Sequence, residues 1–157
     1  MSILIENLTK IYNPDTDFPV TAVNKVTLQV EQGEFVAVMG PSGSGKTTLL
    51  NMLGGIDRPY KGTVTIDGTD ITQLADKELI GFRRDNIGFI FQDFSLLPVL
   101  TAMENVEFVM QLQGKSRMEC EARAVELLTE VGLGDRLGNV PGKLSGGQQQ
   151  RVAVARA

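Results

Sequence analysis

One segment governs how this chain folds: Gly40-Pro41-Ser42-Gly43-Ser44-Gly45-Lys46-Thr47. It fits the pattern G-x-x-x-x-G-K-[ST] at every fixed position. A continuous apolar run, residues 35–39, precedes the segment, and such a run is typical of a strand buried on both faces. Residues 46–53 have the pattern of a helix, which Gly54 and Gly55 would end. A buried strand, a glycine-rich loop and a helix in this order predict an α/β core.

The glycine-rich loop has the residue types that bind phosphate groups. Its glycines let the backbone wrap around an anion, where a Cβ would collide or forbid the required dihedral angles. Consecutive N–H groups would then point at phosphate oxygens, and the helix beginning near Lys46 directs its positive end at the same charge. We expect Lys46 to span the β- and γ-phosphates of a nucleotide and the Thr47 hydroxyl to ligate Mg²⁺. The predicted contacts are Gly40, Pro41, Ser42, Gly43, Ser44, Gly45, Lys46, Thr47 and Thr48.

Composition restricts the class of protein. The 157 residues are enough for one domain with a core, and 42% hydrophobic with 22% charged residues indicates a globular chain. A net charge of −4 with scattered basic residues gives no electrostatic footprint for nucleic acid. No run approaches the roughly 18 apolar residues of a membrane span, and the N-terminus lacks the pattern of a secretory signal. The lone Cys120 excludes an internal disulfide, so we expect a reduced, cytoplasmic domain.

Strand patterns dominate the sequence before Gln92 and helix patterns dominate after it. The predicted strands cover residues 4–11, 26–30, 35–39, 62–68 and 87–91. Three capping boxes predict helix starts at Thr101-Ala102-Met103-Glu104, Ser116-Arg117-Met118-Glu119 and Ser145-Gly146-Gly147-Gln148. The second helix is expected to bury a stripe made of Met118, Ala122, Val125, Leu128 and Val131. We therefore predict an α/β core with an N-terminal antiparallel β region and an inserted helical subdomain.

A second glycine-rich helix start lies at Leu144-Ser145-Gly146-Gly147-Gln148. Ser145 can cap the helix, while the two glycines leave backbone N–H groups uncovered at the positive end of its dipole. This arrangement favours a second anion site. An ordinary cap that is weakened by glycine and binds no ligand also fits the motif, and both interpretations stay open on the motif alone.

Together the two motifs resemble the ABC ATPase family, and the resemblance extends over nearly the whole chain. Residues 144–157 look like the family's signature motif and its following helix. Gln92 is placed like the Q-loop glutamine, and Tyr12 like the aromatic residue that stacks on adenine. Within the family, the sequence of residues 33–40, 87–92 and parts of 97–106 is most similar to ATPase subunits of the lipoprotein-release and macrolide-export type.

The resemblance implies an ATP hydrolase that works as a head-to-tail homodimer and drives transport. ATP on Lys46 of one subunit would be closed over by Ser145, Gly146, Gly147 and Gln148 of the other. Gln92 would be the catalytic residue that senses Mg²⁺ and the attacking water, and it would link hydrolysis to a transmembrane subunit. Such a subunit would lie on the inner face of the cell membrane.

Three of these roles have plainer alternatives. Gln92 also fits a polar residue at a strand end, and Tyr12 fits a core or edge aromatic. The uncharged segment 94–103 fits either subdomain core or a docking surface for the membrane subunit. Competing functions are a non-transport ABC ATPase in cell division, envelope remodelling or DNA repair, and a non-hydrolysing fragment of such a protein.

The resemblance also implies parts that these residues lack. The family continues after its signature helix with an apolar strand ending in Asp-Glu and with a later histidine, whereas this sequence contains no histidine. We expect a chain truncated before this Walker B motif, with its general base beyond Ala157, that binds nucleotide weakly and does not turn it over. The expected divisions are a nucleotide-binding core (1–92), a helical subdomain (93–143) and the signature motif with its helix (144–157).

Overall fold

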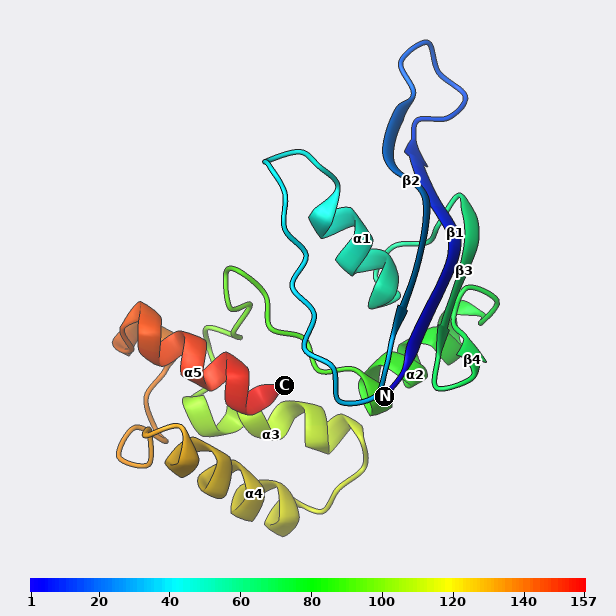
Figure 1. The fold of residues 1–157 in the computed structure, drawn as a ribbon. Coiled ribbons are helices and arrows are strands. Elements are labelled where there is room, and N and C mark those ends of the chain that lie inside the picture. The colour runs from blue at the N-terminus through cyan, green and yellow to red at the C-terminus, as the bar shows by residue number, and fades with distance from the viewer. The chain divides into compact units, whose positions relative to one another are not determined.

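The computed structural model describes all 157 residues, which form two compact units, residues 1–83 and residues 84–157. Unit 1 contains β1 (Ile3–Tyr12), β2 (Val20–Val30), α1 (Lys46–Leu53), β3 (Lys61–Ile66) and β4 (Thr69–Asp70). Helix α2 (Asp76–Asn86) begins in unit 1 and ends in unit 2. Unit 2 contains α3 (Ala102–Leu112), α4 (Arg117–Glu130), the 3₁₀ turn η1 (Pro141–Lys143) and α5 (Gly146–Arg156); the three helices are labelled in Figure 1. None of these helices is long and apolar enough to cross a bilayer.

Unit 1 is built on a four-stranded antiparallel sheet in the order β2-β1-β3-β4. In the centre of the sheet, Ile5 of β1 lies between Leu28 of β2 and Val64 of β3. The alternation along β1 is interrupted by a register shift after Ile5, where Asn7 has a positive φ of 50°. This bulge explains the imperfect alternation of the sequence, because the extra residue lets both Ile5 and Leu8 point into the core.

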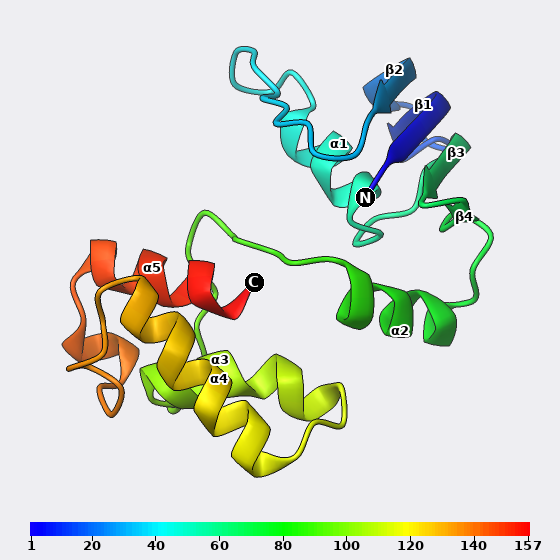
Figure 2. The ribbon, with the colours of Figure 1, turned by 60° about the horizontal axis from the view of Figure 1, so that its bottom comes forward.

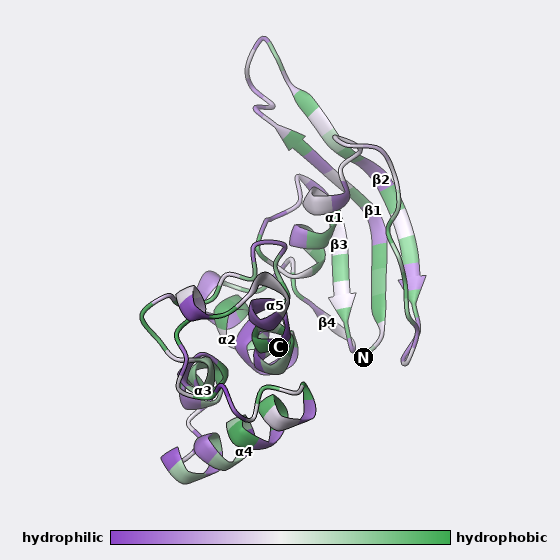
Figure 3. Ribbon diagram, turned by 90° about the vertical axis from the view of Figure 1, so that its left-hand side faces the viewer, coloured by the Kyte–Doolittle hydropathy of each residue, from purple (hydrophilic) through white to green (hydrophobic).

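Helix α1 packs beside this sheet, as Figure 1 shows. It begins at Lys46 and is ended by Gly54, as the sequence predicts. Met52 is its buried residue. In Figure 3, apolar stretches run along β1, β2 and β3. The predicted strands at 4–11, 26–30 and 62–68 are therefore confirmed, with β2 reaching further back along the chain, to Val20.

Unit 2 is a helical layer in which α3, α4 and α5 contact one another, side by side in Figure 2. All three predicted capping boxes are present, each with both of its reciprocal hydrogen bonds. The helices share one apolar core, made of Ala102, Val106, Ala124, Leu128, Leu133, Leu144, Val152 and Ala155. Local capping therefore sets where the helices begin, and the shared core holds them together.

The predicted buried stripe of α4 is only partly right. Leu128 is buried and Val131 packs on the core, as predicted, whereas Met118 is 79% exposed and Val125 is also on the exposed side. The buried residues of the helix are Cys120, Ala124 and Leu128, four positions apart along one face. Two of these three side chains are small, which lets α4 approach its neighbours closely. The sequence offers apolar residues on both faces, and the position of α3 and α5 selects between them.

The two predicted buried strands at 35–39 and 87–91 are also wrong. Neither segment is a strand, and Phe35 and Met39 are 96% and 88% exposed. Ile90 is more than half exposed as well. A strand requires hydrogen-bonded neighbours, and no strand of this chain pairs with either segment. An apolar run therefore does not by itself predict a buried strand, because burial also requires a neighbouring strand.

Candidate functional site

The glycine-rich loop enters α1 through backbone conformations that favour glycine. Gly43 and Gly45 have positive φ values of 78° and 87°, in the region that other residues rarely adopt. A Cβ on Gly45 would also collide with the backbone carbonyl oxygen of Ala22 in β2. The loop is therefore tied to β2, and the sequence pattern is matched by the geometry it requires.

The first turn of α1 has no side-chain cap. Its N-cap is Gly45, and the first bond that closes the helix runs from the Leu49 N–H to the Gly45 carbonyl at 2.8 Å. The N–H groups of Lys46, Thr47 and Thr48 therefore have no intrahelical acceptor, and no acidic residue lies in the first turn. Helices α3, α4 and α5 all carry complete capping boxes, and α2 has Asp76 and Glu78 in its first turn, so α1 is the helix start that is left open to an anion.

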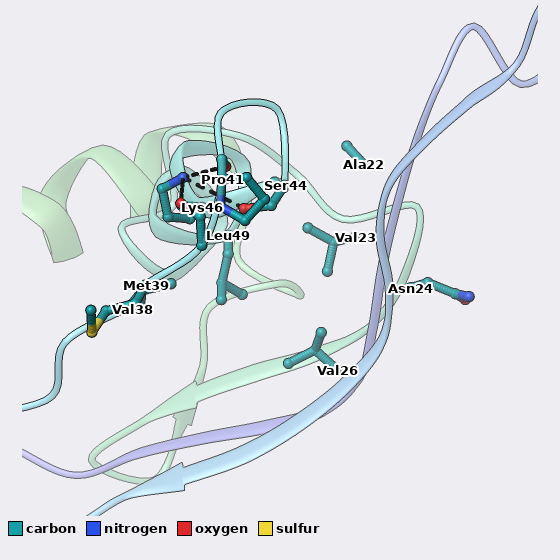
Figure 4. Close-up of a pocket in the computed structure, with 12 residues that line it drawn as sticks. Ala22, Val23, Asn24, Val26, Val38, Met39, Pro41, Ser44, Lys46 and Leu49 are labelled. Carbon is teal, nitrogen blue, oxygen red and sulfur yellow. Dashed lines mark hydrogen bonds between the residues drawn. The ribbon is translucent and has the colours of Figure 1, made fainter.

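Lys46 lies folded over its own loop (Figure 4). Its Nζ donates to the carbonyl oxygens of Gly40 and Pro41, both at 2.8 Å, and lies 3.5 Å from the Ser44 hydroxyl. All three partners are neutral, and no carboxylate is within ion-pair distance of this ammonium group. A phosphate oxygen is a stronger acceptor than a carbonyl, so Lys46 is a cation that an anionic ligand can recruit.

A pocket of about 330 Å³ lies between the loop and β2. Its polar end is formed by Ser44 and Lys46, and its apolar side includes Val23 and Val26, which Figure 4 shows directed toward the loop and α1. The full lining is Ala22, Val23, Asn24, Val26, Val38, Met39, Gly40, Pro41, Ser44, Gly45, Lys46 and Leu49. The predicted contact residues 40–48 are thus only partly in this pocket, and the first turn of α1 lies at its edge.

Tyr12 lies beside the first turn of α1. Its hydroxyl donates to Asp57 Oδ2 at 3.0 Å and is 3.5 Å from the Thr48 hydroxyl. The side chain is 39% exposed, so it is not a buried core aromatic. The structure therefore places the predicted base-stacking residue next to the helix that the phosphate loop opens.

Two residues around Tyr12 were missed by the sequence reasoning. Lys10 Nζ donates to Asp57 Oδ1 at 2.5 Å and lies 5.0 Å from the centroid of the Tyr12 ring. Partial burial acts to raise the pKa of Asp57, but the hydrogen bonds from Lys10 and Tyr12 and the charge of Lys10 outweigh it and lower that pKa. The spacing of Lys10 and Tyr12 on one strand places them on one face, whereas nothing local marks Asp57.

Gln92 lies in an exposed turn of unit 2. The turn runs from Phe91 to Phe94 and is closed by the Phe94 N–H, which donates to the Phe91 carbonyl at 3.0 Å. Phe94 and Ser95 both have positive φ values, 63° and 44°. Non-glycine residues rarely adopt this conformation, so the turn after Gln92 is held in place by its surroundings.

The start of α5 carries the second predicted motif. The Ser145 hydroxyl accepts from the Gln148 N–H at 3.3 Å, and the Gln148 side chain accepts from the Ser145 N–H at 2.8 Å. Gly146 and Gly147 are exposed, have helical φ, and have open space where a Cβ would lie. Nothing within this chain therefore requires glycine at these two positions, although glycine weakens a helix.

Part of the segment 94–103 belongs to the core of unit 2, and part of it is exposed and available for docking. Leu96, Ala102 and Met103 pack on the core of unit 2. Val99 is 82% exposed, and Leu97 is partly exposed. The segment is thus anchored at both ends and presents apolar side chains at its middle.

Comparison with known proteins places this geometry in a family. A family model described as ABC transporter matches residues 23–157. The chain is 50% identical over 145 residues to the macrolide export ATP-binding/permease protein MacB of Rhodopirellula baltica, covering 91% of this chain and 21% of that protein. It is 46% identical over 155 residues to the lipoprotein-releasing system ATP-binding protein LolD of Bacteroides thetaiotaomicron, covering 99% of this chain and 69% of that protein.

The fold is similar to that of a solved cassette. It matches the dimeric structure of the ATP-binding cassette MJ0796 of Methanocaldococcus jannaschii with a TM-score of 0.90. That structure is of a post-hydrolysis state bound to ADP and Pi. The match is 46% identical and covers 98% of this chain and 68% of that chain. This confirms the predicted fold class, an α/β P-loop core with an antiparallel β region and a helical subdomain.

The extent of these matches is also informative. The chain spans 63% of the length of one curated relative and 67% of the length of another, both of them ABC transporter ATP-binding proteins. The family match covers both glycine-rich motifs and Gln92. On this basis the chain belongs to the ABC transporter family, and its relatives include proteins of the lipoprotein-release and macrolide-export type.

Proposed function

We propose that this chain is the nucleotide-binding part of the ATP-hydrolysing subunit of an ABC transporter, and that the general base for hydrolysis is not among these 157 residues. It binds Mg-ATP through residues 40–48, pairs with a second copy through residues 145–148, and powers export or lipoprotein release through a membrane partner. The resemblance to the macrolide export protein MacB and to LolD of the lipoprotein-releasing system supports the two kinds of transport. The side chains of residues 94–103 that are exposed form the proposed contact for the membrane subunit.

The observation that carries the proposal is the open start of α1. Three N–H groups without intrahelical acceptors and an ammonium group without a carboxylate partner lie at one end of one helix. Both kinds of group favour an anion with several oxygens, as a triphosphate provides. The collision of a Gly45 Cβ with β2 supports a loop kept in shape for this ligand.

The proposed metal is Mg²⁺ bound together with the nucleotide. Thr47 lies in the first turn of α1 and is exposed, so its hydroxyl is available as one ligand. Mg²⁺ usually keeps several waters and is bound through few protein ligands plus phosphate oxygens, which fits a site with one hydroxyl. Gln92 is proposed to contact the metal or the attacking water, since it lies in an exposed turn.

The proposed second copy would explain the glycines of α5. Gly146 and Gly147 leave backbone N–H groups uncovered where no residue of the same chain approaches. Glycine is expected where a backbone must come close to a ligand or another chain. The similar cassette is described as a dimer bound to ADP and Pi, which supports pairing of two nucleotide-binding chains.

Calorimetric titration of the chain with Mg-ATP tests the proposal. Lys46→Ala should weaken binding by roughly 10- to 100-fold, because hydrogen bonds to charged groups contribute about 1.5–3 kcal/mol each. Lys77→Ala is the matched control, since Lys77 is an exposed lysine on α2. Equal affinities of wild type and Lys46→Ala, with unchanged circular dichroism, would contradict the proposed site.

A further inference from the structure

We propose that Lys10 and Asp57 are positioning residues that fix the ring of Tyr12 for stacking on the base of the bound nucleotide. The inference rests on the proposed nucleotide site and extends it to recognition of the base. Lys10 and Asp57 do not themselves touch the ligand. They act through Tyr12, and their effect is on the part of the affinity that depends on the base.

The three side chains form one closed network. Asp57 accepts from Lys10 Nζ on Oδ1 at 2.5 Å and from the Tyr12 hydroxyl on Oδ2 at 3.0 Å. Lys10 also donates to the Arg58 carbonyl oxygen at 2.7 Å. The side chains of Lys10 and Asp57 are only 14% and 27% exposed, so this ion pair is better shielded than a surface pair. Both oxygens of Asp57 are used, and the hydroxyl end of Tyr12 is held in one place.

Lys10 also occupies one face of the ring. Its ammonium nitrogen lies 5.0 Å from the ring centroid of Tyr12, within the range of a cation–π contact. Tyr12 nevertheless remains 39% exposed. A flat ring with a cation over one face and with solvent access elsewhere offers its other face to a single stacked partner. The network therefore selects which side of Tyr12 a base can use.

The same network connects the ring to the phosphate site. The Tyr12 hydroxyl is 3.5 Å from the hydroxyl of Thr48, which directly follows Thr47 in α1. Asp57 belongs to the loop that leaves this helix, and Lys10 and Tyr12 belong to β1. A ring fixed to both elements keeps one position relative to the phosphate loop. A base and its triphosphate can then be bound together without first ordering the ring.

Fixing the ring before binding should raise the affinity for nucleotides that carry a base. Ordering one side chain on binding costs an amount that corresponds to roughly a two- to tenfold change in affinity. Inorganic tripolyphosphate contacts the phosphate loop but has no base. Its affinity therefore should not depend on Lys10, Asp57 or Tyr12, and it separates positioning of the ring from damage to the loop.

The test compares the affinities of the chain for Mg-ATP and for Mg-tripolyphosphate by calorimetry. Lys10→Met keeps the aliphatic stem and removes the cation. Asp57→Asn keeps the size of the side chain and removes the charge. Each should weaken Mg-ATP binding roughly two- to tenfold and leave tripolyphosphate binding unchanged. In a Tyr12→Ala background, Asp57→Asn should cause no further loss, because its effect passes through the ring.

Three results would overturn the inference. One is an equal loss of affinity for Mg-ATP and for Mg-tripolyphosphate in Asp57→Asn, which is expected if the network only holds β1 against α1. Another is an Asp57→Asn effect on Mg-ATP that persists in Tyr12→Ala. The third is no change in Mg-ATP affinity in either single variant. Failure of the underlying nucleotide site would appear differently, as wild-type chain that binds neither ligand or as Lys46→Ala that binds both normally.

Discussion

Arg156 donates a hydrogen bond from its guanidinium to the backbone carbonyl oxygen of Phe94 at 2.9 Å, 62 residues earlier in the chain. A second bond runs from the same guanidinium to the Ser95 carbonyl at 2.6 Å. The two accepting residues are the pair with positive φ in the turn after Gln92. Each such residue costs of order 1 kcal/mol or more, so a compensating contact is needed to keep the turn in this conformation. Arg156 provides it from the last position of α5.

Arg156→Met should therefore destabilise unit 2. The substitution keeps much of the side chain's length but removes both donors, which leaves two strained carbonyl groups without their partner. We expect the free energy of unfolding to fall by about 1.5–3 kcal/mol, measured by urea denaturation. Hydrogen exchange of the Phe94 and Ser95 amides should accelerate more than that of α3.

The control for this prediction lies one and a half turns away on α5. Arg151 is exposed and donates to no residue of the chain, so Arg151→Met should change the free energy of unfolding by less than about 0.5 kcal/mol. Arg156→Lys should lie between wild type and Arg156→Met, because an ammonium group can satisfy one carbonyl. Equal stability of the Arg156 and Arg151 variants would show that the turn needs no such contact.

Asn105→Asp should produce a pH-dependent loss of stability. Asn105 is fully buried and accepts from the Leu97 N–H at 2.8 Å, while its Nδ2 donates to the carbonyls of Leu97, Leu100 and Thr101 at 2.9–3.1 Å. An aspartate would face three carbonyl oxygens without a proton to donate. We expect a loss of about 2–4 kcal/mol at pH 7, measured by denaturant unfolding.

The pH profile of Asn105→Asp identifies the cause of that loss. Burial next to carbonyl oxygens favours the protonated acid, so the folded pKa of the new carboxyl should be raised above its unfolded value. A raised folded pKa gives stability that is fully present below the unfolded pKa and lost as pH rises through the folded pKa. The variant should thus approach wild type in acid. A deficit of the same size at every pH would indicate a steric cause instead.

These polar contacts show where sequence reasoning stops. The start of α1 after its glycine-rich loop and the three capping boxes were predictable because each depends on residues within eight positions of one another. Asp57 and Arg156 could not be assigned their roles, since their partners are brought close by the fold, up to 62 residues away along the chain. Their side chains give no local pattern that separates a network from a solvated surface.

The same distinction applies to the apolar segments. Residues 35–39 and 87–91 have the composition of buried strands, but composition does not specify a hydrogen-bonded neighbour, and neither segment has one. On α4, both faces carry apolar residues, and only the packing of α3 and α5 determines that Ala124 is buried and Val125 is not. Period and composition therefore specify neither the hydrogen-bonded neighbour that a strand requires nor the face of a helix that its neighbours cover.

Glu107→Gln should stabilise unit 2 at neutral pH. Glu107 is a buried carboxyl of α3, and its pKa is raised by burial first, then by the charges of Glu121 and Glu104, with Arg117 acting in the opposite direction. The Gln111 amide donates to it at 3.2 Å, and a glutamine can still accept this bond. At neutral pH the variant removes the cost of holding a charge in this position.

The sign of this effect sets its pH window. Because the folded pKa of Glu107 is raised, its contribution to stability is fully present below the unfolded pKa of about 4.3 and is lost as pH rises through the folded pKa. The melting temperature of Glu107→Gln should exceed that of wild type at pH 7, and the difference should vanish toward pH 4. Glu6→Gln, at an exposed position of β1, should show no such change.

Gly146→Ala should separate the stability of the chain from its pairing with a second copy. Gly146 is the first residue of α5, its φ is not positive, and open space lies where the added Cβ would be. Alanine restricts the unfolded chain, so the free energy of unfolding should rise by about 0.4–1 kcal/mol. The same methyl group would lie on the surface proposed to cover ATP on a second copy, and Mg-ATP-dependent dimerisation should weaken.

Urea denaturation and sedimentation velocity with Mg-ATP measure these two effects on the same samples. Gly138→Ala is a suitable control, because Gly138 also has open space and no positive φ but lies outside the motif. Its dimerisation should match that of wild type. A Gly146→Ala chain that is more stable but no longer dimerises would show that glycine is needed here for contact with the partner and not for folding. A variant that dimerises as tightly as wild type would contradict a close approach of the second copy at Gly146.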